Sequence, residues 1–305
     1  MFLSQIRSNA RRTGLNAAVT TKNTPALFNW MADAASFQGI SDVVAEGFMD
    51  AHGRAAWGDM EAALNSTCRC PKLTSYWRFE KCGCRKIAGT CNQPTHHENC
   101  PVPALPMRNG NLQQMAYSLF LFMRDVAQGD FVGWIDERLA EVSPSGAHRI
   151  ERLGQALVQP LRNIHGLSDK VLNMVLSELL LGTGLRRPHW VEAGGGLIAV
   201  DTLVHNFLHR TGILHGMHAQ HPYGPACYRP GGCADVIRVL SAEIDAKRFN
   251  RAFPSDFPRF VQKAIWSYCA GNGMNICNGN KIEDHRRCAQ MDCRIFARCA
   301  RRTLQ

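Results

Sequence analysis

Cysteines are the residues of this 305-residue chain with the most evident chemistry, and five of the thirteen fall near the C-terminus. Four of them, Cys277, Cys288, Cys293 and Cys299, follow the pattern C-x10-C-x4-C-x5-C. Four soft thiolates in a compact loop can hold a [4Fe–4S] cluster. Structural zinc is the rival, but its ligands usually come in pairs two to four residues apart, which this run lacks. We expect an iron–sulfur cluster here, and a buried thiol at the fifth cysteine, Cys269.

A second group of cysteines falls in residues 66–106, a stretch rich in Cys, Pro, Gly and Thr that we interpret as an irregular insert. Its candidate ligands for a second metal site are Cys68, Cys70, Cys82, Cys84, Cys91 and Cys100, with His96 and His97 beside them. The two C-x-C pairs depart from the usual C-x2-C spacing, so zinc, a second iron–sulfur centre and no metal all stay open. Basic residues alternate here with Tyr76, Trp77 and Phe79, which suits either a nucleic-acid contact or a solubilised insert.

Histidines form a third group of residues with potential for metal chemistry. They are His205, His209, His215, His218 and His221. His205 and His209 share a helix face at i, i+4, but no third ligand of known geometry accompanies them. We interpret the five as surface or phosphate-contacting histidines rather than as a metal site.

Composition limits the classes of protein to which the chain can belong. A formal charge of +10 and 45% hydrophobic residues indicate a globular protein with a positive field that attracts polyanions, nucleic acid first. No stretch approaches the roughly 20 apolar residues that span a bilayer, and the N-terminus lacks a secretory signal. We expect a cytoplasmic protein, associated with the nucleoid in a bacterium, in which the cysteines bind metal rather than form disulfides.

Helical periodicity dominates the rest of the sequence, and the predicted fold class is all-α. The segment from Leu112 to Met123 is apolar nearly all round, which predicts a buried central helix. Further helices are predicted at 131–142, 148–159, 169–182, 202–213, 233–246 and 256–269. Residues 182–196, rich in Gly with one Pro, are predicted to form a loop.

The segment 164–182, IHGLSDKVLNMVLSELLLG, combines a tight turn with a helix start. Gly166 permits the turn, and Ser168 can cap the helix that follows. The free amides and positive dipole end of such a helix suit a phosphate. An ordinary connection between two helices has the same local features, so the segment alone does not decide between the two interpretations.

Two motifs in this region resemble those of the helix-hairpin-helix DNA glycosylases. The run Ile164-His-Gly-Leu-Ser-Asp-Lys170 resembles the Leu-Pro-Gly-Val-Gly-x-Lys hairpin of endonuclease III-like and 8-oxoguanine glycosylases, and Ala199-Val-Asp-Thr202 resembles their Val-Asp-Thr-His segment. Endonuclease III-like enzymes also end in four cysteines, spaced C-x6-C-x2-C-x5-C. This chain departs from the family at Ser168, which replaces a glycine, at His165, which replaces a proline, and at Leu203, which replaces a histidine.

The resemblance implies a fold of two helical lobes with a C-terminal [4Fe–4S] loop. The implied ranges are N-terminal helices packed on the cluster lobe at 1–65, the insert at 66–106, a helical lobe with the hairpin at 107–215 and the cluster lobe at 216–305. DNA would bind between the lobes through His165, Gly166, Ser168, Gln113 and Gln114.

The resemblance also implies an activity: a monomer excising a damaged or modified base from double-stranded DNA. Lys170 would attack the sugar C1′, and Asp201, which can cap the helix after it, would stabilise the developing positive charge. The imine formed would allow β-elimination at the abasic site. The alternatives are a monofunctional glycosylase in which Asp201 activates water, and a non-catalytic DNA-binding iron–sulfur protein.

Overall fold

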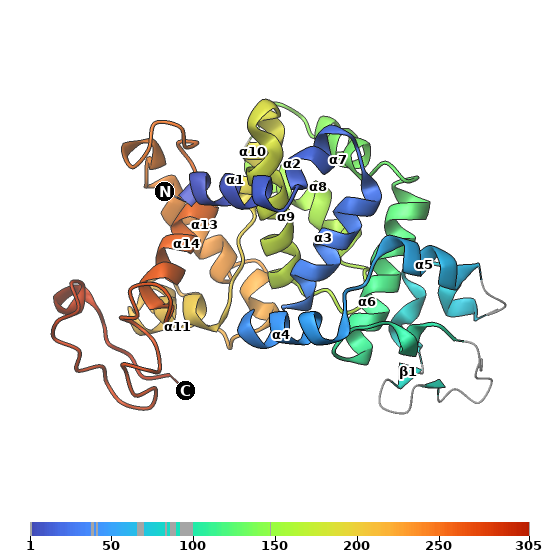
Figure 1. Cartoon of the computed structure of the whole chain (residues 1–305). Helices are drawn as coiled ribbons and strands as arrows, with labels where there is room; N and C mark the ends of the chain where they lie inside the picture. The colour runs from blue at the N-terminus through green and yellow to red at the C-terminus, as the bar shows by residue number, and fades with distance from the viewer. Residues whose placement is uncertain are drawn as a thin grey trace. The chain divides into compact units, whose positions relative to one another are not determined.

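The computed structural model describes residues 2–37, 40, 42–65, 70–82, 84–85, 90–91, 100–146 and 148–304 (Figure 1). The regular secondary structure of these residues is helical apart from two short strands, β1 (Cys84–Arg85) and β2 (Thr90–Cys91), which pair antiparallel with Cys84 opposite Cys91. The predicted all-α class is confirmed. In the described ranges, every helix is too short or too polar to cross a membrane.

The chain folds into two compact units, Leu3–Trp190 (unit 1) and Val191–Gln305 (unit 2). The helices of unit 1 are α1 (Phe2–Arg12), α2 (Leu15–Thr20), α3 (Thr24–Ser36), α4 (Asp42–His52), α5 (Trp57–Leu64), α6 (Gly110–Leu121), α7 (Phe131–Ala140), α8 (Arg149–Leu161) and α9 (Asp169–Thr183), with short turns η1 (Pro71–Thr74), η2 (Arg78–Lys81), η3 (Val102–Ala104), η4 (Phe122–Val126) and η5 (Gly184–Arg186). The helix α10 (Pro188–Gly196) contains the boundary. Unit 2 holds α11 (Thr202–Arg210), α12 (Ile213–Gly216), α13 (Cys233–Ala242) and α14 (Pro258–Cys269), with turns η6 (Pro225–Tyr228), η7 (Ala246–Arg248) and η8 (Phe296–Arg298). This division groups the N-terminal helices with the hairpin, whereas the resemblance placed them on the cluster lobe.

The core of unit 1 forms around α3, which contacts α2, α5, α6, α7 and α9. Its residues Leu27 and Phe28 have no exposed surface, and the Phe28 ring meets Trp57 and Phe120 edge to face, at centroid distances of 5.8 and 6.0 Å. Edge-to-face pairs of this kind add to the stabilisation that burial of aromatic area supplies. The helices on which the hairpin rests are therefore held by a rigid aromatic core.

The helix α6 is the buried central helix that the sequence predicts. Its apolar positions are at most 1% exposed, and they include Leu112, Met115, Ala116, Leu119 and Phe120. The helix continues into a π-helical turn, η4, whose Phe122 and Met123 are also buried. A helix apolar on all sides is stable only when neighbours cover every face, as α3, α5 and the turns of the insert do here.

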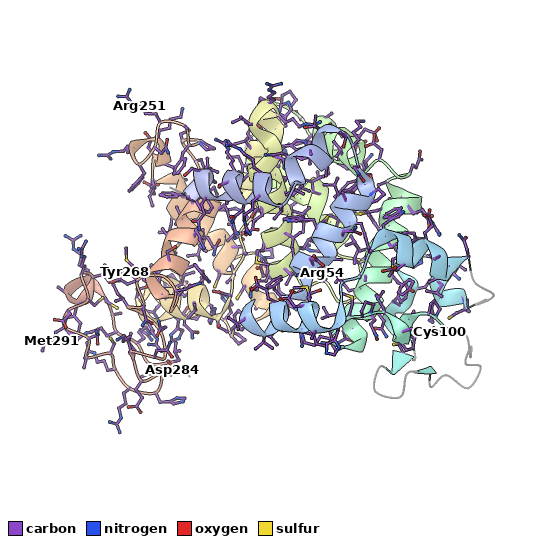
Figure 2. The ribbon with its side chains drawn as sticks, in the orientation of Figure 1. Arg54, Cys100, Arg251, Tyr268, Asp284 and Met291 are labelled. Carbon is purple, nitrogen blue, oxygen red and sulfur yellow. The ribbon has the colours of Figure 1, made fainter. Side chains whose placement is uncertain are left out.

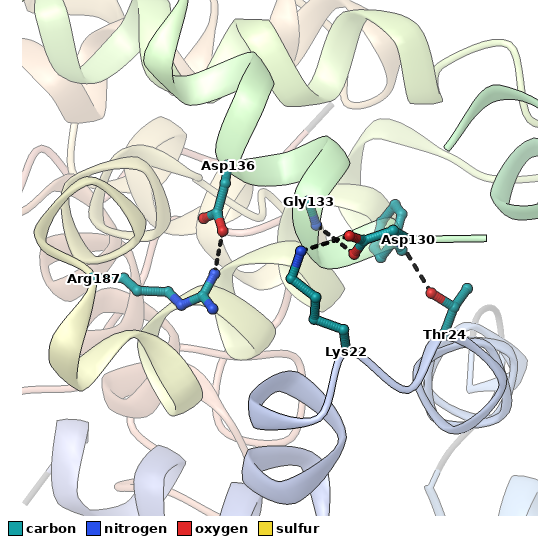
Figure 3. Close-up of polar contacts among 7 residues, drawn as sticks. Lys22, Thr24, Asp130, Gly133, Asp136 and Arg187 are labelled. Carbon is teal, nitrogen blue, oxygen red and sulfur yellow. Dashed lines mark hydrogen bonds and ion pairs between the residues drawn. The ribbon is translucent and has the colours of Figure 1, made fainter. Parts of the chain in front are cut away.

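The prediction of a loop at 182–196 is wrong, because α9 extends to Thr183 and α10 covers Pro188–Gly196. Proline is well tolerated in the first turn of a helix, where its missing N–H would have no partner. The indole of Trp190 is buried and donates to Asp136 at 2.6 Å, and Asp136 also pairs with Arg187 (Figure 3). Tertiary packing of Trp190 thus outweighs the low helix propensity of the glycines that follow it.

The core of unit 2 lies where α14 packs against α11 and α13. It includes Val200, Val204, Leu208, Ile237 and Ile265, all of them buried, together with the thiols of Cys227, Cys233, Cys269 and Cys277. The part of this unit after Ala270 consists mainly of loop and short turns. Such a segment has little hydrophobic core of its own, which is the usual situation of a loop organised by bound metal.

The start of α7 shows how polar contacts fix one helix to another in unit 1 (Figure 3). Asp130 caps α7 by accepting from the Gly133 amide at 2.7 Å, and it also accepts from Lys22 Nζ at 2.6 Å. The next amide, that of Phe131, donates to Thr24 Oγ1 at 3.0 Å. Burial raises the pKa of Asp130, but the contacts with Lys22 and Gly133 outweigh this and hold the pKa below its ordinary 3.8.

Removal of this cap gives a test of the fold. Asp130→Ala should lower the free energy of unfolding by about 1 kcal/mol near pH 7. Asp130→Asn should cost less, because asparagine caps as well as aspartate. Since the pKa of Asp130 is lower in the folded protein, its stabilisation is present above pH 3.8 and lost as the pH falls below that value. Urea unfolding at neutral and acid pH measures both effects, and an Asn variant as unstable as the Ala variant would refute the cap as the cause.

Candidate functional site

The predicted hairpin before α9 is a tight turn pressed against α6. Gly166 has a φ of 75°, in the left-handed region that favours glycine. A Cβ added there would lie 2.9 Å from the carbonyl oxygen of Asn111 and 3.4 Å from Met115 Cβ. Both the backbone conformation and the close approach to α6 therefore require glycine at this position.

A buried hydroxyl on α6 links the hairpin to the insert. Ser118 Oγ accepts from the His165 amide at 3.1 Å and donates to the carbonyl of Tyr76. The Leu167 amide is also bonded, to the carbonyl of Ile164 at 3.3 Å. These amides are committed within the protein, so an anion at the hairpin would meet the first turn of α9 instead.

The helix α9 begins as the sequence predicts, with Ser168 as its cap. Ser168 Oγ accepts from the Val171 amide at 3.4 Å. Lys170 is the second residue of the helix and is half-buried. Asp169 beside it pairs with Arg162 at 2.7 Å, which ties the end of α8 to the start of α9. A lysine and an arginine therefore flank the dipole-positive end of a long buried helix.

An open groove of about 940 Å³ runs along the hairpin. It is lined by Trp77, Arg162, Asn163, Ile164, His165, Gly166, Leu167 and Ser168. Trp77 is 57% exposed, and the Tyr76 ring that meets it edge to face is itself packed on Phe122, at 5.1 Å. The insert thus contributes an exposed indole, on an anchored backbone, to the surface that the hairpin forms.

The predicted DNA contacts of Gln113 and Gln114 are not supported, since both side chains are buried on α6. Gln113 has no exposed surface, and its Nε2 donates to the carbonyls of Pro103 and Leu105 at 2.8 and 2.9 Å. Gln114 is 6% exposed. An amide that satisfies buried carbonyls has a structural role, and the prediction for Gln113 is wrong on this ground.

The second metal site predicted in the insert falls partly outside the described residues, which do not include Cys68, His96, His97 or the Cys91 side chain. Cys70, Cys82, Cys84 and Cys100 (Figure 2) are half-buried cysteines. The Cys84 thiol lies 3.5 Å from Gln113 Oε1, so this strand is joined to α6. The site stays a prediction.

In unit 2, Asp201 follows a buried extended segment and caps α11, as the sequence predicts. Its Oδ1 accepts from the Val204 amide at 2.9 Å. The preceding residue, Val200, donates its amide to the hydroxyl of Tyr228 at 2.8 Å. Burial, followed by the nearby charge of Asp201, raises the pKa of Tyr223. The Asp201 carboxylate is thus fixed by its own helix, and the backbone before it is fixed by η6.

The four cysteines predicted to hold a cluster line one pocket in unit 2. Arg210 lines it too; this arginine is 2% exposed and pairs with Asp284 (Figure 2). Its Nε and Nη1 are buried without a hydrogen-bond partner within the described residues. A buried guanidinium with two unpaired nitrogens favours a negatively charged group beside it. Four thiolates around iron or zinc would carry such a charge.

Cys269 does not line the pocket, and its thiol contacts one of the four cysteines that do, Cys277. Its side chain has no exposed surface, as predicted, and its thiol donates to Cys277, which raises the pKa of Cys269 and lowers that of Cys277. Tyr268 (Figure 2), from α14, places its hydroxyl 3.0 Å from Cys293 Sγ. Burial raises the pKa of Cys299.

A second group of ligands lies in the core of unit 2, and the sequence interpretation missed it. One ligand atom each from His205, His221, Cys227 and Cys233 lies within 4.8 Å of the others, close enough to bind a metal ion. The interpretation of His205 as a surface histidine is wrong, because it is 6% exposed. The regular spacing His-x5-Cys-x5-Cys was the available signal. His209, which shares a helix face with His205, lies outside the group, and burial lowers the pKa of His209.

The hydrogen-bond pattern within this group favours one thiolate. The Cys233 thiol donates to Cys227 and lowers the pKa of Cys227 to about 4, while the same bond raises the pKa of Cys233. Both cysteines have no exposed surface. A buried thiolate is costly unless a cation or strong donors accompany it.

The candidate residues therefore fall into two sets, with the hairpin and Lys170 in unit 1 and Asp201 and both groups of metal ligands in unit 2. Comparison with protein-family models, curated protein sequences and solved structures found no match to the chain.

Proposed function

We propose that this protein is a DNA glycosylase of the helix-hairpin-helix type that removes a damaged or modified base and then cleaves the abasic site. The observation that supports this most is the hairpin itself. Gly166 turns the chain tightly against α6, Ser168 caps α9, and Lys170 stands in the first turn of that helix. This arrangement brings an amine to the positive end of a helix, where a phosphate binds well.

The proposed chemistry needs a nucleophile and a carboxylate. The amine nitrogen of Lys170 forms a bond to C1′ of a flipped-out nucleotide as the glycosidic bond breaks. The electrons of that bond go to the base, which takes up the proton that the amine loses. The Asp201 carboxylate stabilises the positive charge that develops on the sugar. The amine adduct then opens to an imine, loss of a C2′ proton forms a double bond, and the 3′-phosphate leaves.

We propose that Cys277, Cys288, Cys293 and Cys299 hold the [4Fe–4S] cluster that the sequence predicts. Zinc, with Zn–S bonds of about 2.3 Å, would draw its four sulfurs to within about 4 Å of one another. These four line one pocket, and within the described residues the ligand atoms that lie within 4.8 Å of one another belong to a different group. The cluster would brace the loop and supply no redox step in base removal.

The loop that the cluster would brace is basic. Its exposed cations are Lys281, Arg286, Arg287, Arg294 and Arg298. Cations of this kind contact phosphates and position a protein on DNA without reading its sequence. Together with the formal charge of +10, they support double-stranded DNA as the partner.

Imine trapping tests the proposed nucleophile without knowledge of the natural base. Incubation with an abasic-site duplex and borohydride should give a covalent adduct with the wild-type protein and none with Lys170→Ala or Lys170→Arg. The Arg variant keeps the positive charge, so it should still bind the duplex while it loses the amine chemistry. Denaturing gels and a binding titration measure the two effects.

Lys247→Ala, which removes an exposed lysine of η7, is the matched control and should form the adduct normally. An adduct that persists in Lys170→Arg would exclude Lys170 as the nucleophile. Absence of an adduct with the wild type, alongside base release, would favour the monofunctional alternative.

The cluster is tested by metal analysis of protein purified without oxygen. The wild type should contain iron and acid-labile sulfide in equal amounts, about four of each per chain. Cys288→Ser with Cys293→Ser should lose both, together with the broad visible absorption. Cys269→Ala should keep them, because its thiol lies outside the pocket. Zinc in place of iron in the wild type would contradict the assignment.

The exposed indole of the groove is tested by affinity. Trp77→Ala should weaken binding to single-stranded or abasic DNA by roughly 5- to 150-fold, the value of one base stacked on an aromatic ring. Trp77→Phe should retain most of the affinity, since a smaller ring still stacks. Fluorescence anisotropy at fixed salt measures this. Equal losses in both variants would argue against stacking, and unchanged affinity in both would remove Trp77 from the interface.

A further inference from the structure

The group of His205, His221, Cys227 and Cys233 is assembled from four separate elements of unit 2. His205 lies on α11, Cys227 on η6 and Cys233 at the start of α13, while His221 belongs to the segment between α12 and η6. His205 and both cysteines are buried, and His221 is half-buried. Polar side chains that converge inside a hydrophobic core need a common partner to offset the loss of water.

We propose that these four side chains bind one tetrahedral zinc ion that has a structural role and is distinct from the C-terminal cluster. Two nitrogens and two sulfurs form the donor set of many structural zinc sites, and four protein ligands leave no position open for water or substrate. This inference does not depend on the proposed glycosylase activity.

The spacing of the donor atoms fits a single ion. Zinc at about 2.3 Å from sulfur and 2.0–2.1 Å from nitrogen places neighbouring ligand atoms about 3.3–3.8 Å apart in a tetrahedron. His205 Nδ1 lies 3.3 Å from Cys233 Sγ and 3.6 Å from Cys227 Sγ. Cys233 Sγ lies 3.3 Å from His221 Nε2. All three separations fall within that range.

The second ring nitrogen of His221 has the partner expected of a metal ligand. Nδ1 of His221 lies 2.7 Å from the Ala219 carbonyl oxygen, to which it can only donate. That bond fixes the proton on Nδ1 and leaves the lone pair of Nε2 directed at the thiols.

The backbone is also shaped to bring the two cysteines together. A Cβ added at Gly232, next to Cys233, would clash with the Ala226 carbonyl oxygen and lie 2.8 Å from that of Cys227. Only glycine allows the chain before α13 to pass so close to η6. The absence of a side chain at this position therefore lets the start of α13, with Cys233, lie beside the turn that contains Cys227.

The ion would fix the segment that contains Asp201. His205 follows Asp201 by one helical turn on α11, and Tyr228, next to Cys227, hydrogen-bonds the Val200 amide. A metal that joins Cys227 to His205 therefore holds the backbone on both sides of Asp201. Without it, η6 and α11 would be joined only by the weaker contacts of the core.

Zinc analysis and X-ray absorption on the full-length wild-type protein test the site. We expect about one zinc per chain, with a first shell of two sulfurs at about 2.3 Å and two nitrogens at 2.0–2.1 Å. A shell of four sulfurs would place the zinc at the C-terminal cysteines and overturn the proposal. Protein without zinc, or with a Cys227–Cys233 disulfide in its mass spectrum, would overturn it as well.

Variants test the ligand set. Cys227→Ser with Cys233→Ser should lose the zinc while keeping its iron, and amide hydrogen exchange over residues 198–208 should become faster. His209→Ala and His215→Ala, which alter neighbouring histidines outside the group, should keep the zinc. Zinc retained in the double variant, or lost in His209→Ala, would overturn the assignment. Iron content and imine trapping remain separate readouts, so failure of the zinc site and failure of the proposed activity are distinguishable.

Discussion

The close seating of the hairpin on α6 is the constraint on which the arrangement of unit 1 depends. The turn at Gly166 lies so near the Asn111 carbonyl that a methyl group would not fit, and the buried hydroxyl of Ser118 satisfies the amide of His165. The same hydroxyl bonds the carbonyl of Tyr76. A single side chain therefore satisfies two backbone groups from distant parts of the sequence, and leaving either unpaired would cost about 1–3 kcal/mol. Because Tyr76 is held in this way, the neighbouring residue Trp77 is positioned along the groove.

In unit 2 a capped helix start is held in a comparable way, although by different chemistry. Asp201 caps α11, and Tyr228 bonds the residue before it. The proposed zinc ion would add a second link there, from Cys227 of η6 to His205 of α11. In both units the backbone before the helix is thus held by a side chain from another element, Ser118 in unit 1 and Tyr228 in unit 2. Catalytic groups require a fixed geometry of this kind, because displacing a reacting group by about 1 Å lowers the reaction rate.

Periodicity and capping chemistry predicted much of this fold, because both depend on residues close in sequence. The buried face of α6 and the caps Ser168 and Asp201 are local features, and the structure contains all three. The errors came where distant residues decide the outcome. Helix α10 depends on Trp190 reaching Asp136, which lies 54 positions earlier. From its neighbours in the sequence, Gln113 could be a surface residue. In the fold its amide donates to two carbonyls of the insert, and its side chain is buried. The first and last ligands of the His–Cys group are 28 residues apart, and only the fold brings them together.

The two groups of metal ligands in unit 2 differ in the ways that govern metal selection. The His–Cys group combines two borderline nitrogen donors with two sulfurs set close together, which suits a single zinc ion and is too narrow for a cluster of several atoms. The C-terminal group offers only sulfur, in a pocket beside the buried Arg210 guanidinium, two of whose nitrogens lack a partner within the described residues. A negatively charged group, such as the proposed iron–sulfur cluster, would suit a pocket of this kind. Because donor type and separation act together in metal selection, we expect the two groups to differ in the metal that they prefer.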